Sequence, residues 1–159
     1  MRPSLQTQVV FSNNCIRIEV DVTAGIIFVE WLRHPSSLEF RRLYQKASDI
    51  SFEYNCLYWI SDARAVHYLE IADQNWILRE LAPRLKTTSL LRYARVMTED
   101  GVAMLDAARV RDSVMNSPYL TEGKFQVQFF LDKESALEWL LSEREADRNP
   151  YHRKELLSE

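Results

Sequence analysis

The sequence has little glycine. Its 159 residues include three, Gly25, Gly101 and Gly123, and no two of them lie close together. The phosphate-binding loops of P-loop proteins and of dinucleotide-binding domains need closely spaced glycines, because the backbone must approach the phosphate groups. Binding of ATP or NAD through those motifs is therefore excluded, and we predict no cofactor.

Cysteine and long apolar runs are also scarce. Cys15 and Cys56 are the only two cysteines, and neither belongs to a C-x-x-C pair. The first ten residues lack the apolar core of a secretory signal, and no apolar run approaches the roughly 20 residues that a membrane-spanning helix needs. We expect a cytoplasmic protein without a membrane span, in which both thiols are reduced and pack as small hydrophobic side chains.

An excess of positive charge is absent as well. Lysine and arginine together number 20 against 23 acidic residues, which gives a net charge of −3. Proteins that bind nucleic acids neutralise phosphates with basic side chains, so we predict no nucleic-acid partner. The three histidines form no H-x-H or H-x-x-x-H pair, and no zinc site is predicted.

The composition is that of one folded domain. Hydrophobic residues make up 47% of the chain and charged residues 27%, which is enough apolar material for a core. We place a single domain at residues 9–142. Residues 143–159 are mostly charged and are expected to form a tail.

Five segments carry strand patterns. Residues 16–22 alternate apolar and charged side chains, and a short turn with Gly25 leads to an apolar run at 26–31, so these two segments predict a hairpin. Later apolar runs are typical of strands covered on both faces. These runs lie at residues 56–60, 90–97 and 125–131.

Helical patterns separate the later strands. A capping-box spacing at Ser36 and Glu39 begins a helix that lasts to about Ser51. Asp62 is the expected N-cap of a second helix, and Asp132 that of the last one. The three remaining predicted helices lie at about 65–81, ending near Pro83, at 100–115, and after residue 132.

Together these patterns predict an α/β fold. Its element order is β-β-α-β-α-β-α-β-α. Right-handed crossovers between the later strands would give a mixed, mainly parallel five-stranded sheet that opens with an antiparallel β-hairpin.

This order, with the segment "FQVQFFLDKESALEWLL" at 125–141, resembles the STAS-like fold of anti-sigma factor antagonists. It is most similar to an uncharacterised bacterial branch grouped with STAS and CRAL-TRIO-type domains, and the resemblance covers about residues 9–141. Five residues fit the F-x-D-x-x-x-A-x-x-W-L pattern of that branch: Phe130, Asp132, Ala136, Trp139 and Leu140.

The resemblance implies a non-enzymatic protein-interaction domain. Regulatory antagonists of this fold carry a phosphorylated Ser or Thr directly after an Asp, followed by a Gly, where the central strand meets its helix. In this chain the order is reversed, Ser61 then Asp62, and no Gly follows Arg64. The chain therefore resembles these antagonists in where the segment lies, at the end of the central strand, but it does not contain their phosphorylation motif.

The carboxyl ends of parallel strands are the usual place for ligands and partners. Polar residues follow each predicted strand, and large aromatic side chains accompany them. We predict a partner or ligand face formed by Trp31, Arg33, His34, Ser61, Asp62, Arg64, Trp76 and Glu99.

Three classes of function remain open. The first is a STAS-like interaction module that forms a homodimer or binds another signalling protein. The second is a carrier of a small apolar or lipid-like ligand, which CRAL-TRIO kinship and the aromatic residues suggest. The third is an enzyme using the acidic cluster of Glu99, Asp100 and Asp132, which could hold Mg²⁺, although Asp100 and Asp132 equally suit helix starts. We predict the first class, without catalytic residues or a metal.

A homodimer is favoured by three features. The opening hairpin places a strand near the edge of the sheet, where unpaired backbone groups invite association. Trp31 and Trp76 are large for a core of this size, and symmetric dimers are the commonest oligomers.

Overall fold

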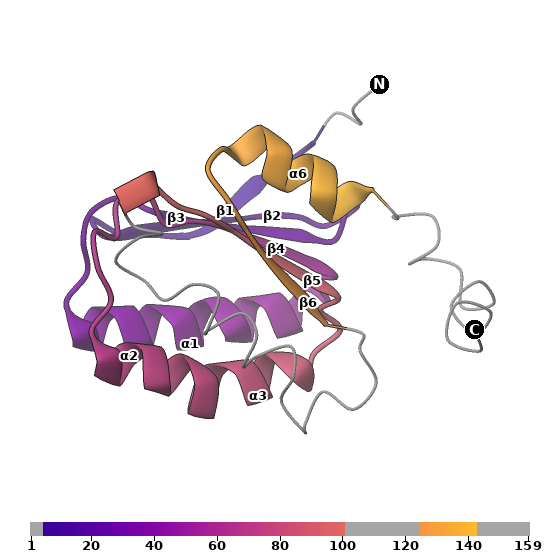
Figure 1. Ribbon diagram of the computed structural model, residues 1–159. Helices are drawn as coiled ribbons and strands as arrows, with labels where there is room; N and C mark the ends of the chain where they lie inside the picture. Colours follow the sequence, from indigo (N-terminus) through magenta and orange to yellow (C-terminus); the bar gives the residue numbers. More distant parts are fainter. Residues whose placement is uncertain (1–4, 101–124, 143–159) are drawn as a thin grey trace, which may run out of the picture.

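The structure is a computed structural model that describes residues 5–100 and 125–142. A single sheet of six strands runs through the molecule, with helices on both of its faces (Figure 1). Its strands follow one another in sequence order from one edge to the other. They are β1 (Gln8–Ser12), β2 (Ile16–Asp21), β3 (Ile26–Trp31), β4 (Tyr58–Asp62), β5 (Arg92–Val96) and β6 (Gln126–Phe130).

The sheet is mixed, as predicted. β1, β2 and β3 pair antiparallel, and β3, β4, β5 and β6 pair parallel. The prediction of five strands is wrong, because β1 adds a third antiparallel strand at the edge. Its residues are exposed or half-buried, and its pairing with β2 shifts register between Val9 and Phe11. A strand that buries so little shows no clear alternation in the sequence.

The helices divide between the two faces of the sheet. α1 (Ser37–Glu53), α2 (Ile71–Trp76) and α3 (Ala82–Lys86) cover one face, and α6 (Lys133–Leu141) covers the other (Figure 1). The strand order explains the first group. Right-handed crossovers that step in the same direction across a sheet place their helices on the same face.

The second helical segment differs from its prediction. Residues 63–70 are not helical, and the helix begins at Ile71 instead of near Ala65. It then continues through a π-helical turn, η1 (Ile77–Leu81), into α3, so Pro83 lies inside the helical segment and does not end it. The Ala82 N–H donates to the Ile77 carbonyl five residues back. This change of hydrogen-bond register comes directly before a residue that has no N–H to donate.

The remaining helix predictions have different outcomes. The capping box of α1 and the Asp132 cap of α6 are confirmed, with Ser36 Oγ accepting from Glu39 N–H and Asp132 accepting from Ser135 N–H. The helix predicted at 100–115 and the tail at 143–159 lie, apart from residue 100, outside the described residues. None of the described helices is both long and apolar enough to cross a membrane.

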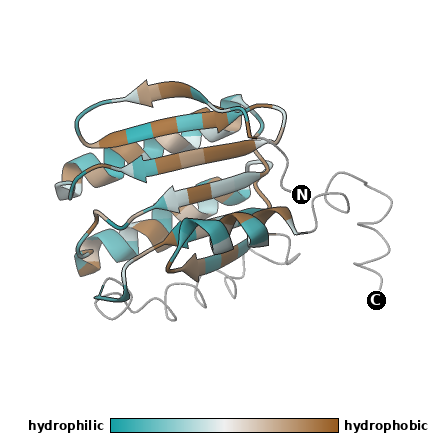
Figure 2. Cartoon of the chain, turned by 90° about the horizontal axis from the view of Figure 1, so that it is seen from above, coloured by the Kyte–Doolittle hydropathy of each residue, from teal (hydrophilic) through white to brown (hydrophobic). Residues whose placement is uncertain are grey.

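Alternation along the strands divides the core in two. Ile27, Val29 and Trp31 of β3 face α1, whereas Ile26 and Phe28 face α6. Hydrophobic residues accordingly concentrate along the strands of the sheet (Figure 2). Cys15 and Cys56 are free thiols buried in the α1 side of the core. Burial raises the pKa of Cys56 to about 12, so this thiol behaves as an apolar group.

Candidate functional site

The loops after β3 and β4 meet at the carboxyl edge of the sheet. His34 follows β3 and His67 follows β4, and the His67 N–H donates to His34 Nδ1 at 3.1 Å. The two imidazole rings stack with their centroids 5.6 Å apart, and the Tyr68 ring lies 4.4 Å from that of His34. Burial, together with the neighbouring His67, lowers the pKa of His34. We call the surface around this junction, with the residues that follow β5 and β6, the strand-end face.

Arg33 is held by the start of α1. Its guanidinium donates to both carboxylate oxygens of Glu39, at 3.1 and 2.6 Å. Glu39 also accepts from the Ser36 N–H as part of the capping box. The hydrogen bonds from Arg33 and Ser36 lower the pKa of Glu39 from its ordinary 4.5 to about 2. The Arg33 charge is therefore neutralised within the chain.

Asp62 and Arg64 form a second pair at the same edge. Arg64 donates to Asp62 through Nε at 2.9 Å and Nη2 at 2.7 Å, and its backbone N–H donates at 3.2 Å. Burial opposes the ionised form of Asp62, but the hydrogen bonds from Arg64 outweigh it and the pKa of Asp62 is lowered. The expectation that Asp62 caps a helix is wrong, because no helix begins until Ile71.

The structure brings together part of the predicted face. Arg33 and His34 lie where the loops after β3 and β4 meet, Asp62 and Arg64 pair with each other at the end of β4, and Glu99 is exposed after β5. Asp132 follows β6 as the cap of α6. Among the described residues, no group of three or more His, Cys, Asp or Glu side chains is placed to hold a metal ion.

Trp31 and Ser61 do not belong to the strand-end face. Trp31 is 3% exposed, and its ring packs 5.9 Å from Phe40 and 5.4 Å from Tyr44. Ser61 is fully buried beneath α1. Both lie near the end of a strand, but the two-residue period of the strand points their side chains inward. Trp76 is half-buried and contacts Phe40 edge-on, so it too contributes to packing.

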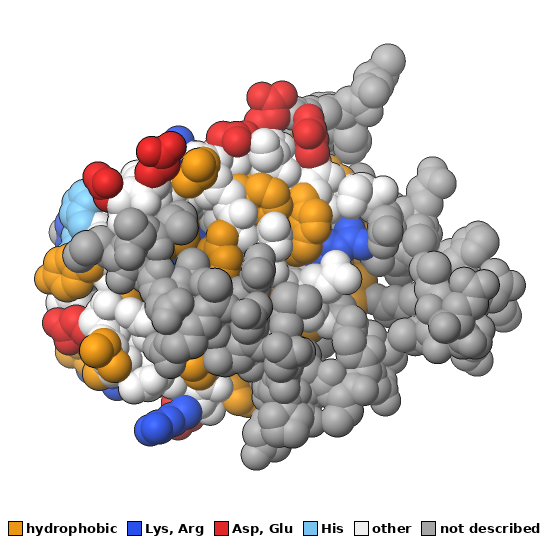
Figure 3. Space-filling view, viewed as in Figure 1, with side chains coloured by type: hydrophobic (Ala, Val, Ile, Leu, Met, Phe, Trp, Pro, Cys, Tyr) orange, Lys and Arg blue, Asp and Glu red, His pale blue; other side chains and the backbone are white. Residues whose placement is uncertain are grey.

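Apolar side chains gather on the strand-end face. Eight large hydrophobic residues are exposed among those described, and five of them lie at this edge. Ile71 is the most open, at 72% exposed. At the left of Figure 3 orange side chains lie beside red and pale blue ones, which marks this edge. The five residues are Leu32, Leu38, Tyr68, Ile71 and Leu131.

A polar groove runs through the same region. It has a volume of about 460 Å³ and lies between the loop after β3, the start of α1 and the loop after β4. Asp73 closes its floor by accepting from Ser37 Oγ at 2.7 Å and from Arg41 Nε at 2.8 Å. Charged, aromatic and apolar groups thus share one concave edge of the molecule.

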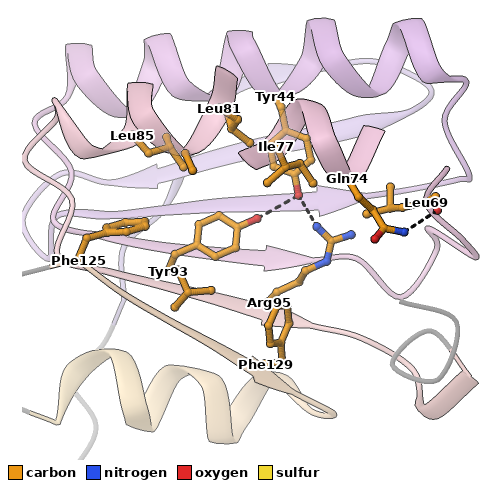
Figure 4. A pocket seen from close by; sticks show the side chains of 12 residues that line it. Tyr44, Leu69, Gln74, Ile77, Leu81, Leu85, Tyr93, Arg95, Phe125 and Phe129 are labelled. Atoms are coloured by element: carbon orange, nitrogen blue, oxygen red, sulfur yellow. Dashed lines mark hydrogen bonds between the residues drawn. The ribbon is translucent and has the colours of Figure 1, made fainter. Parts of the chain in front are cut away.

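A second candidate site lies beneath the helices. Arg95 of β5 is 4% exposed, and its Nη1 donates to the Tyr44 hydroxyl at 2.9 Å. That hydroxyl also lies 3.0 Å from the Tyr93 hydroxyl (Figure 4). Its distance to Ser61 Oγ is 3.4 Å. Beside this group is a cavity of about 50 Å³ that is lined mostly by apolar side chains.

Burial affects the pKa of two groups beside this cavity, Tyr93 and Arg95. Burial, with a further contribution from Tyr44, raises the pKa of Tyr93 well above its usual value, so this hydroxyl stays protonated. Burial disfavours the charge on Arg95, but its interactions with Tyr44 and Tyr93 outweigh that effect and its pKa is raised. The sequence analysis missed this site. The sequence feature that points to this site is the run "LLRYARVM", because it places Arg92 and Arg95 in a strand that is expected to be covered on both faces.

Comparisons with known proteins find no family model that matches the chain, and no curated protein sequence matches it.

Proposed function

We propose that this chain is a non-enzymatic protein-interaction module of the STAS-like type, and that it binds a second copy of itself through the strand-end face. One observation carries the proposal. Five of the eight exposed large hydrophobic residues among those described lie at that edge. Apolar side chains grouped on a surface and bordered by charged ones are typical of protein interfaces.

The edge of the sheet is a weaker alternative for association. β1 is one of the two edge strands of the described sheet, the other being β6, and its pairing with β2 contains a register shift between Val9 and Phe11. Irregularities of this kind are a common way in which proteins keep an edge strand from pairing with another chain. The Lys46 ammonium also lies 4.4 Å from the Phe11 ring and adds a charge there. Self-association through the strand-end face is therefore favoured over pairing through β1.

Sedimentation velocity at micromolar concentration tests the proposal. We expect a dimer for the unmodified chain and a shift to monomer for Ile71→Ser and for Leu131→Ser. Phe52→Ser is the matched control, because Phe52 is 66% exposed but lies near the far end of α1. The proposal fails if the unmodified chain sediments as one species near 18.8 kDa at every concentration. It also fails if only the control variant dissociates.

A second candidate function is the carriage of a small ligand with an apolar part. A separate observation favours it, the cavity beside Arg95.

A further inference from the structure

Arg95 is a buried arginine with which no carboxylate of the described residues pairs. It lies in β5, the strand next to β6, opposite Ser61 of β4 on one side and Phe129 of β6 on the other. None of the ion pairs formed among residues 5–100 and 125–142 includes it. A buried charge is costly unless a group of opposite charge accompanies it.

The hydrogen bonds around the guanidinium are incomplete as well. Nη1 donates to the Tyr44 hydroxyl, whereas the buried Nε has no hydrogen-bond partner among the described residues. The polar side chains grouped around it, Tyr44, Tyr93 and Ser61, offer hydroxyl oxygens as acceptors and contain no carboxylate. An arginine fork normally binds a carboxylate through two parallel N–H groups.

The cavity supplies room for such a group and an apolar wall beside it. In Figure 4 the guanidinium extends from β5 toward the space beneath α2 and α3, with Ile77 and Leu85 on the helix side and Phe129 below. The volume is about 50 Å³. An apolar cavity of about 150 Å³ holds a benzene molecule, so this one accommodates only a few heavy atoms.

We propose that the cavity beside Arg95 binds a monocarboxylate of two or three carbon atoms, with the carboxylate on the guanidinium and the methyl or ethyl group against Ile77 and Phe129. The carboxylate supplies the negative charge and the acceptor that the buried guanidinium lacks. This inference gives the ligand class of the second candidate function. It is independent of self-association, because the cavity lies beneath the helices and not on the strand-end face.

Ligand-observed NMR and calorimetry with acetate and propanoate test the proposal on the full chain. Propanamide is the matched neutral ligand, since it has almost the shape of propanoic acid without the charge. We expect saturable binding of the carboxylates and at least tenfold weaker binding of propanamide. Inorganic phosphate is the second comparison, and it should bind no better than propanamide because it has no apolar group.

Two variants connect the binding to the site. Arg95→Met should remove carboxylate binding and remain folded, because an apolar side chain of similar volume replaces an unpaired buried charge. Arg92→Met is the matched control, since Arg92 lies in the same strand, is also 4% exposed, and faces α6, where it donates to the Leu140 carbonyl. It should change the affinity by less than about twofold, as expected for a residue without contact to the cavity.

A third variant tests the proposal even if Arg95→Met does not fold. Ile77→Phe fills the cavity from a half-buried position of η1 and leaves Arg95 in place, and it should also weaken binding at least tenfold. The proposal is overturned if neither carboxylate binds the unmodified chain at millimolar concentration. It is equally overturned if Arg95→Met or Ile77→Phe, folded by circular dichroism, binds as the unmodified chain does. Neither result bears on the dimer, which sedimentation measures separately.

Discussion

Tyr44 joins α1 to the centre of the sheet. Its hydroxyl contacts polar groups of β4 and β5, while its ring lies among Trp31, Phe40 and Trp59. One residue thus combines apolar packing with the hydroxyl that accepts from Arg95 Nη1. Removing any one side chain from such a buried hydrogen-bond network should lower stability, because its former partners are then left buried without a hydrogen bond.

Tyr44→Phe should lower the free energy of unfolding by about 1–3 kcal/mol, because Arg95 Nη1 loses its acceptor in a buried place. In the Arg95→Met background the same change should cost less. We expect a coupling energy between the two residues of about 0.5–3 kcal/mol in a double-mutant cycle. Urea denaturation of the four proteins measures it. Equal costs in both backgrounds would show that the hydroxyl serves another partner.

Glu39 should make stability depend on pH in the acid range. Its pKa is about 2 in the folded chain against an ordinary 4.5, so the folded state favours the ionised form. The resulting stabilisation is fully present above about 4.5 and is lost as the pH falls toward 2. Denaturation of the unmodified chain and of Glu39→Gln across this range should give curves that converge at low pH. Curves that stay parallel would contradict the assignment.

At the scale of elements, two strand-to-helix junctions look alike in sequence but differ in structure. The loop after β3 ends at Ser36, the N-cap of α1, which forms a capping box with Glu39. The loop after β4 runs from Ala63 to Glu70 and contains no helix. Ser36 therefore accepts from a helix N–H, and Asp62 accepts from the neighbouring Arg64. Ser and Asp are both common N-cap residues, but Ser36 caps a helix whereas Asp62 forms a local ion pair.

This difference predicts unequal effects of two alanine substitutions. Ser36→Ala should cost about 0.5–2 kcal/mol through loss of a helix cap. Asp62→Ala should cost about 0–1 kcal/mol, because its partner Arg64 is half exposed and regains water. Chemical denaturation under the same conditions compares them. A larger loss for Asp62→Ala than for Ser36→Ala would give Asp62 a structural role beyond this pair.

The elements that the sequence predicted well are those with a regular period and a clear boundary. β2 and β3 follow from alternation and Gly25, and α1 follows from Ser36 and Glu39. The edge strand β1 and the irregular residues 63–70 could not be predicted, because neither buries a regular face. The group around Arg95 depends on pairing over long range, with Ser61 placed opposite Arg95 by the register of β4 and β5. No local pattern contains that information.

At the scale of the whole molecule, the two candidate sites occupy different places in the fold. The cavity beside Arg95 lies between the sheet and the helices α2 and α3, and the strand-end face lies at the carboxyl edge. The opposite face of the sheet is covered by α6 through Ala136 and Leu140. A chain arranged in this way can bind a partner at its edge and a small molecule inside.

Native mass spectrometry of the chain purified from its own host tests the central claim, self-association through the strand-end face, most directly. The account predicts a species of twice the 18.8 kDa chain mass, and its conversion to the single chain mass by Ile71→Ser but not by Phe52→Ser. A single species of 18.8 kDa that does not change when the protein is concentrated would contradict it.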